Sequence, residues 1–197
     1  IAVLAATSGS AAAQTYPVKP VRIINPFSPG GSLDLVARIR EAIPNVALST
    51  DMIVGFPGET DEDFADTLSL TEAVQFHSMF SFKYSPRPNT LAAQRMADDV
   101  PETEKTRRIM ALQQLQKGIQ TRLHQRSIGR SVDVLVDTTS RRRAWELAGR
   151  TTGNTVVNFP GAPEWLGQFV QVRIERAGAF GVWGQPVGAP AAATSSV

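Results

Sequence analysis

The spacing of apolar residues changes twice along this chain, and each change restricts what the segment can fold into. Residues 47–54 (ALSTDMIV) form a short apolar run that suits a buried strand of a parallel sheet. A turn follows at 55–58, and Thr60 with Asp63 three residues later is close to the capping box that begins helices. Residues 79–84 suit a second strand. This order of strand, helix and strand predicts a βαβ unit.

Beyond this unit, the chain predicts a long helix followed by a small β-barrel. Residues 91–99 are expected to form a loop, and Pro101 can occupy the first position of a helix that runs to about Gln125. Apolar residues recur there every three or four positions, as one face of a helix requires. After Gly129 the spacing becomes two, and short strands separated by glycine and proline turns predict a barrel. The predicted fold class is α/β followed by a small all-β barrel.

The chain contains no cysteine and two histidines, which limits its metal chemistry. Disulfides, thiolate zinc sites and cysteine-ligated iron–sulfur clusters are excluded within the chain. No ligand spacing indicates another metal site, and no catalytic residue is assigned. No run approaches the ~20 apolar residues of a membrane-spanning helix, so we expect no membrane partner.

The net charge of +2 hides an uneven distribution. Residues 39–100 carry 4 basic and 10 acidic side chains, whereas residues 101–184 carry 13 basic and 7 acidic ones. A basic part joined to an acidic one is typical of a nucleic-acid binder attached to another module. A solvated surface of mixed sign gives the same counts, so charge alone does not decide between the two.

The first 38 residues differ in character from the rest. Residues 1–14 end in small side chains, with Ala11 and Ala13 spaced as in a signal-peptide cleavage site, and a disordered leader has the same composition. Residues 16–38 (YPVKPVRIINPFSPGGSLDLVAR) resemble the first strand, loop and helix start of the periplasmic solute-binding proteins of tripartite tricarboxylate transporters. Nothing downstream continues that family. We therefore expect this segment not to be integrated into the fold of the rest.

Three runs carry a second and longer resemblance. They are STDMIVGFPGETDEDFADTL at 49–68, FSFKYSPRPNT at 80–90 and GRTTGNTVVNF at 149–159. In order and spacing they resemble the MiaB-type tRNA methylthiotransferases, over roughly residues 38–184. The third run is similar to the tRNA-modifying branch rather than the branch that modifies a ribosomal protein. Asn89 stands where that family usually has glycine, a tolerable change because asparagine visits positive φ more readily than most residues.

The resemblance implies a domain organisation. Residues 1–38 are the signal-like and transporter-like segment, and 39–125 are the C-terminal part of a radical S-adenosylmethionine barrel. Residues 126–186 look like a TRAM domain, a small RNA-binding barrel, and 187–197 form a disordered tail.

The resemblance also implies a function. The family adds a methylthio group to isopentenyladenosine beside the tRNA anticodon, in the cytoplasm, using S-adenosylmethionine and iron–sulfur clusters. The implied partner is tRNA, not DNA. The cluster cysteines should precede Arg38 and none is present, so we expect a chimeric fragment that binds neither cofactor fully and is inactive alone.

Two sets of site residues follow. The cofactor set shares one strand face and the loop after it: Ser49, Asp51, Gly55 and Gly58. The RNA set is basic apart from one asparagine: Arg130, Arg141, Arg142, Arg143, Arg150 and Asn158. Trp145 is available for base stacking. A plain turn, a polar side chain satisfied by its neighbours and a solvated basic turn are the structural explanations that compete with these assignments.

Two other functions stay open on the sequence. The chain could be a stand-alone RNA-binding module with a vestigial α/β half. It could also be a secreted carboxylate-binding protein, which only the first 38 residues support.

Overall fold

The computed structural model describes residues 31–139, 143 and 145–188. The predicted signal peptide, most of the transporter-like segment, Arg141, Arg142 and nearly all of the predicted tail therefore lie outside the described residues. No helix in the described part of the chain is long and apolar enough to cross a membrane.

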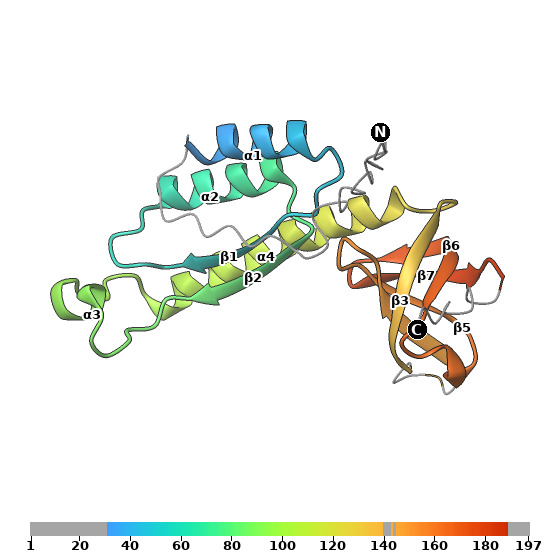
Figure 1. Cartoon of the computed structure of the whole chain (residues 1–197). Helices are drawn as coiled ribbons and strands as arrows, with labels where there is room; N and C mark the ends of the chain where they lie inside the picture. The colour runs from blue at the N-terminus through green and yellow to red at the C-terminus, as the bar shows by residue number, and fades with distance from the viewer. Residues whose placement is uncertain (1–30, 140–142, 144, 189–197) are drawn as a thin grey trace, which may run out of the picture.

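The first half of the described chain is the predicted βαβ unit with further helices (Figure 1). Strand β1 (Ser49–Val54) and strand β2 (Ser78–Lys83) pair in parallel, and helix α2 (Asp61–Val74) connects them. Helix α1 (Gly31–Ala42) lies against α2, and the long helix α4 (Glu102–Gln125) packs on the sheet. Alternation along β1 places Val54 in a buried cluster with Phe64 of α2 and Leu112 of α4, which holds the three elements together.

Local sequence explains where these helices begin. Thr60 caps α2 with the complete capping box, because its hydroxyl accepts from the Asp63 N–H and the Asp63 carboxylate accepts from the Thr60 N–H. Asn89 has a φ of +68°, which agrees with the reason given for its replacing glycine. Two expectations were wrong in detail. The predicted loop contains a short helix, α3 (Leu91–Arg95), capped by Thr90, and Pro101 is the N-cap of α4 rather than its first residue.

The second half confirms the predicted β-barrel. It is closed by five strands in the order β3-β4-β5-β7-β6. Their bounds are β3 Ser131–Thr139, β4 Glu146–Arg150, β5 Val156–Pro160, β6 Phe169–Gly178 and β7 Gly181–Pro186, with the 3₁₀ turn η1 at Pro163–Trp165. Side chains of alternate residues fill the interior, among them Val134, Leu147, Phe159 and Val172.

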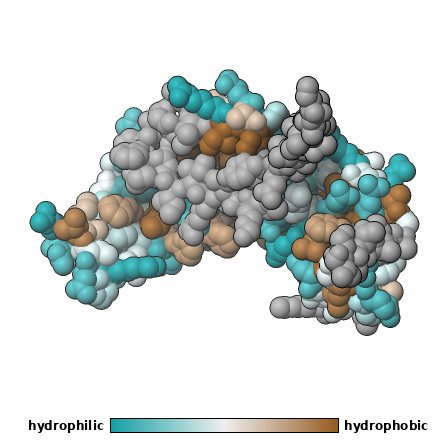
Figure 2. Space-filling view, viewed as in Figure 1, coloured by the Kyte–Doolittle hydropathy of each residue, from teal (hydrophilic) through white to brown (hydrophobic). Residues whose placement is uncertain are grey.

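Helix α4 connects the two halves, and Figure 2 shows a concave notch between them with apolar and hydrophilic residues on both sides. The predicted boundary at residue 38 falls inside α1. Val36 and Ile39 of this helix pack against the buried Leu48, Val74 and Phe76, so the residues on both sides of that boundary belong to one packed unit. The other boundaries stay predictions. So does the radical S-adenosylmethionine barrel, because a single parallel pair of strands occurs in many α/β folds.

Candidate nucleic-acid interface

One outer surface of the barrel is built by strands β4, β5 and β7. Successive side chains of a strand point to opposite faces. Because Leu147, Val157 and Val182 point into the barrel, the side chains next to them point away from its interior. Those neighbours include Glu146, Asn158 and Trp183. Trp183 pairs with Asn158 in the register of β5 and β7, and its Nε1–H donates to Glu146 Oε1 at 3.0 Å.

Two arginines lie over two tryptophans on this surface. The Arg176 guanidinium carbon is 4.2 Å from the centre of the Trp183 ring. The Arg143 guanidinium carbon is 5.4 Å from the Trp145 ring, and Arg143 Nη1 also donates to Glu146 Oε1 at 3.0 Å. Both distances lie within the range of cation–π attraction. We call these residues together the tryptophan surface: Arg143, Trp145, Glu146, Asn158, Arg176 and Trp183.

The tryptophan surface has the chemistry to bind RNA. The indole of Trp145 is 55% exposed, so part of its ring is open to a nucleobase. Guanidinium groups held over such rings supply charge for phosphates and further planar surface for stacking. Glu146 is 5% exposed and its carboxylate accepts from both Arg143 and Trp183, so it fixes the two side chains in place.

The structure divides the predicted RNA residues among different places. Arg143 and Asn158 belong to the tryptophan surface. Arg150 forms an ion pair with Asp137 at 3.3 Å and donates to Asn154 Oδ1 at 2.9 Å, contacts that hold the end of β4 to β3 and to the loop before β5. Arg130 precedes β3 whereas Arg143 follows it, and β3 has nine residues. At ~3.3 Å per residue, these two arginines lie at opposite ends of a strand roughly 30 Å long.

Arg176 and Trp183 were missed from the sequence. The run GVWGQP at 181–186 contains two glycines and a proline, which are unfavourable in strands. The sequence pattern therefore did not indicate strand β7. The signal that could have found it is the alternation of Val182 and Gly184, both buried, around Trp183.

The predicted cofactor residues on β1 lie on an exposed sheet face. The parallel register places Asp51 beside Phe80 and Ile53 beside Phe82, and all four side chains are exposed. Ser49 is half-buried at the start of the same face. The prediction that Ser49 and Asp51 share a face with Ile53 therefore agrees with the register.

The two loop glycines have structural roles. Gly55 has a φ of +70°, and a Cβ there would overlap the side chain of Lys105. Its N–H donates to Glu59 Oε2 at 2.5 Å. Gly58 has a φ of +81°, and its N–H donates to Asp99 Oδ1 at 2.8 Å. Both N–H groups are thus already bonded to carboxylates of the chain.

Two buried cations of α4 hold this loop. Lys105 is 3% exposed and donates to both carboxylate oxygens of Asp98, at 2.5 and 2.7 Å. Arg108 is 4% exposed and donates to the Glu59 carboxylate at 2.7 Å and to its carbonyl oxygen at 2.9 Å. Arg108 Nε also donates to Glu104 at 2.8 Å. Because each buried charge is paired, this network fixes the loop to the helix without an isolated charge in the core.

Iron–sulfur ligands are not supplied by this chain. It contains no cysteine, and the described residues hold no group of three or more histidine, aspartate or glutamate side chains placed to bind a metal ion. The residues present therefore do not fit a cluster of the kind that the family resemblance implies.

Comparison with known proteins shows what the barrel resembles. The model of the TRAM domain family matches residues 125–187, which span the end of α4 and all five barrel strands. The barrel is therefore similar to TRAM domains along its whole length. The predicted start of this domain at residue 126 lies one residue from the matched boundary.

Similarity to curated proteins extends beyond the TRAM domain. The chain is 43% identical over 155 residues to a tRNA-2-methylthio-N(6)-dimethylallyladenosine synthase of Parabacteroides distasonis, which covers 79% of the chain and 34% of that protein. Proteins of the same name match at 44% over 158 residues in Porphyromonas gingivalis (80% of the chain, 34% of the protein) and at 47% over 148 residues in Acidithiobacillus ferrooxidans (75% and 33%). The resemblance to MiaB-type tRNA methylthiotransferases is confirmed for this part of the chain. The chain spans about a third of the length of these relatives.

Proposed function

We propose that this chain is the tRNA-binding portion of a cytoplasmic tRNA methylthiotransferase, and that it holds tRNA through the tryptophan surface of its TRAM barrel. The observation that carries the proposal is the pair of arginine–tryptophan contacts on one outer surface of that barrel. The names of the relatives supply the kind of RNA.

Recognition divides between two kinds of contact. Exposed indole surface stacks on unpaired bases, which contributes about 1–3 kcal/mol per base and tolerates any sequence. Arg143 and Arg176 contact backbone phosphates, which makes binding dependent on salt. We infer that the chain binds RNA that presents unpaired bases next to a structured backbone, as the loop of a tRNA does.

The chemical step needs residues beyond those of this chain. Addition of a methylthio group to isopentenyladenosine is proposed for the complete enzyme, and no step is assigned to an iron–sulfur cluster here because the chain offers no cysteine. A contact of Ser49 or Asp51 with S-adenosylmethionine rests on the family resemblance. Gly55 and Gly58 are explained by the packing of Lys105 and by positive φ, and need no cofactor.

The structure and the comparisons give different support to the two other functions raised by the sequence. A stand-alone RNA-binding module uses the same tryptophan surface, but the similarity to the synthases continues well outside the TRAM domain, which favours the first proposal. A secreted carboxylate-binding protein rests on residues that lie almost entirely outside the described part of the chain.

The test is binding of the full chain to a fluorescently labelled tRNA, followed by anisotropy at several salt concentrations. We expect the double variant R143A/R176A to bind more weakly and to reduce the slope of log K against log salt by roughly 1.4–1.8, the value for two lost phosphate contacts. The matched control is R87A/R95A, which removes two exposed arginines between β2 and α4 and the same net charge. Equal salt slopes for wild type and both double variants would refute the assignment of this surface.

A further inference from the structure

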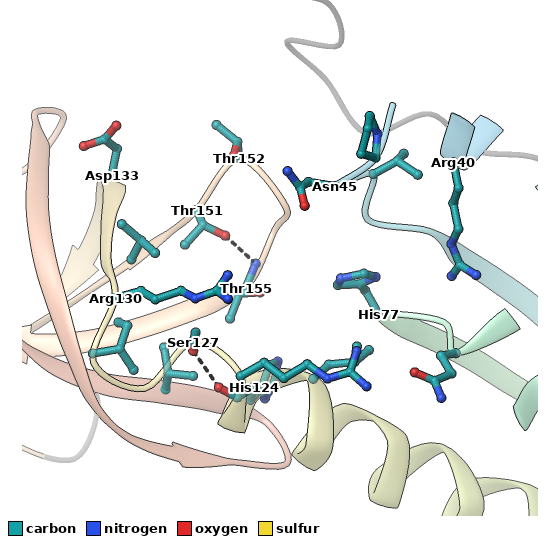
Figure 3. Close-up of a pocket in the computed structure, with 18 residues that line it drawn as sticks. Arg40, Asn45, His77, His124, Ser127, Arg130, Asp133, Thr151, Thr152 and Thr155 are labelled. Atoms are coloured by element: carbon teal, nitrogen blue, oxygen red, sulfur yellow. Dashed lines mark hydrogen bonds between the residues drawn. The ribbon is translucent and has the colours of Figure 1, made fainter. Parts of the chain in front are cut away.

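A cavity of about 650 Å³ lies where the α/β half meets the TRAM barrel (Figure 3). On one side its walls come from the turns after α1 and α2 and from the last turn of α4. On the other side they come from the start of β3 and from the loop at 151–155. We call it the junction cavity. Its volume lies within the usual range of small-ligand sites.

Cationic groups predominate in the lining of the junction cavity. The ionisable residues that line it are Arg40, His77, His124, Arg126, Arg130 and Asp133. Asp133 is the single carboxylate among these described lining residues. The remaining polar lining includes threonine, serine, asparagine and glutamine side chains, which can donate hydrogen bonds to an anion.

Some of these groups already have partners. The Arg40 guanidinium donates to the carbonyl oxygen of Val74 and so completes the end of α2. His124 Nδ1 lies 2.6 Å from the carbonyl oxygen of Gly178. By contrast, neither Arg126 nor Arg130 forms a side-chain ion pair with a carboxylate of the described residues. Both side chains are exposed and so accessible to a ligand. Figure 3 shows Arg130 pointing from the barrel into the cavity toward Thr155.

Helix ends explain part of this charge but not all of it. The C-terminal ends of α1, α2 and α4 meet at the cavity, and their carbonyl groups favour nearby cations. That accounts for Arg40 and for His124 and Arg126 at the end of α4. It does not account for Arg130, which follows the turn after α4 and belongs to the barrel side. Nor does it account for His77 Nδ1, which is buried without a hydrogen-bond partner among the described residues.

We propose that the junction cavity binds a phosphate group, held by Arg126 and Arg130, and that in the proposed function this phosphate belongs to the backbone of the bound RNA. The guanidinium groups of Arg126, at the end of α4, and of Arg130, just before β3, line one polar cavity, and two such groups suit a tetrahedral phosphate with several acceptor oxygens. The anion site itself does not depend on the proposed function; its assignment to RNA does.

The proposal gives the RNA two points of attachment. The junction cavity lies at the start of β3, and the Arg143 end of the tryptophan surface lies beyond its other end. A ligand that reaches both must extend along the barrel for roughly 30 Å, as estimated from the rise of a strand. A folded tRNA meets this requirement, whereas a dinucleotide does not.

The histidines of the chain can report on ligand binding in this cavity. His77 and His124 are its two histidines, and both line the junction cavity. Burial, and then the charges of Arg40, His124 and Arg126, lower the pKa of His77. A phosphate in the cavity opposes the effect of these cations, so binding should raise the pKa of His77. Arg130 and Asp133 also line the cavity from the barrel side, with charges of opposite sign.

The test is NMR spectroscopy of the imidazole signals in the isotopically labelled full chain, titrated first with inorganic tripolyphosphate and then with a tRNA transcript. We expect both imidazole signals to move with either ligand, and the pKa of His77 to rise. Replacing Arg126 and Arg130 by alanine should weaken tripolyphosphate binding at least about tenfold, because each charged hydrogen bond that is lost costs more than that factor. The matched control is R122A, an exposed arginine one turn earlier on α4 that pairs with Glu72 outside the cavity.

The possible outcomes separate the two proposals. Imidazole signals unmoved by tripolyphosphate would overturn the anion site. Signals that move with tripolyphosphate but not with bound tRNA would overturn the RNA phosphate and leave the tryptophan surface as the contact. If tripolyphosphate binds and tRNA does not bind at all, the anion site is upheld and the proposed function fails.

Discussion

Gly55 shows how one residue can look like part of a ligand site and yet be explained by packing. Its positive φ and its place after a parallel strand are typical of loops that bind ligands. In this structure the space that its side chain would fill belongs to Lys105, whose amino group is held by Asp98. The glycine is therefore needed so that the buried Lys105 side chain can pack directly against the loop backbone.

Replacing Gly55 by alanine should lower the free energy of unfolding by about 2–4 kcal/mol, because the new methyl group meets Lys105 and the backbone keeps a φ that alanine disfavours. G58A is the matched control. Gly58 has a similar φ, but a Cβ there meets nothing within 4 Å, so it should lose only about 1 kcal/mol from backbone strain. Urea unfolding followed by circular dichroism measures both. Equal losses would show that the overlap with Lys105 is unimportant.

At the scale of elements, helix α4 both packs against the core and fixes the loop before α2. One face buries Leu112 and Ile119, and the first turns carry the charges that fix the loop before α2. Hydrogen bonds from Arg107, and then the charge and hydrogen bonding of Arg108, lower the pKa of Glu104 to about 2 from its ordinary value of 4.5. The ionised Glu104 thus holds Arg108, which in turn bonds Glu59 of the loop.

This pKa predicts how the stability contributed by Glu104 depends on pH. A carboxyl group whose pKa is lower in the folded state stabilises that state above its unfolded pKa and loses the contribution as pH falls toward its folded pKa. Wild type should therefore be more stable than E104Q at pH 7. The difference should be constant down to about pH 5 and shrink between pH 4.5 and pH 2. Urea unfolding of the two proteins at pH 7, 5 and 3 tests this, and a difference independent of pH would contradict it.

At the scale of the whole molecule, the absence of cysteine means that the chain can bind RNA through its proposed surface but cannot ligate an iron–sulfur cluster through thiolates. We predict that the purified chain acquires no iron–sulfur cluster on anaerobic reconstitution, because cluster assembly of this kind depends on thiolate ligands. Iron and sulfide analysis with an absorption spectrum is the measurement. Near-stoichiometric iron and sulfide with a brown chromophore would prove the prediction wrong. Binding of tRNA measured on the same preparation provides the control that the chain is folded.

Much of the architecture could be predicted from the sequence because its signals are local. Thr60 and Asp63 specify a helix start within four residues, and alternation around Val134 specifies a strand within a few more. The tryptophan surface could be predicted only in part. Arg143 and Trp145 adjoin a visible strand, whereas Trp183 lies in a segment whose glycines and proline argue against one.

The sequence by itself determined the order and type of most elements, the resemblance of the barrel to TRAM domains and the absence of thiolate ligands, since each depends on residue identity at short range. Only the tertiary structure decided which charged residues act together. Arg130 and Arg143 are 13 positions apart and lie at opposite ends of β3, whereas Arg126 and His77 come from different elements and line one cavity. Pairing register and helix packing bring distant residues together, and neither can be read from the spacing of single residues.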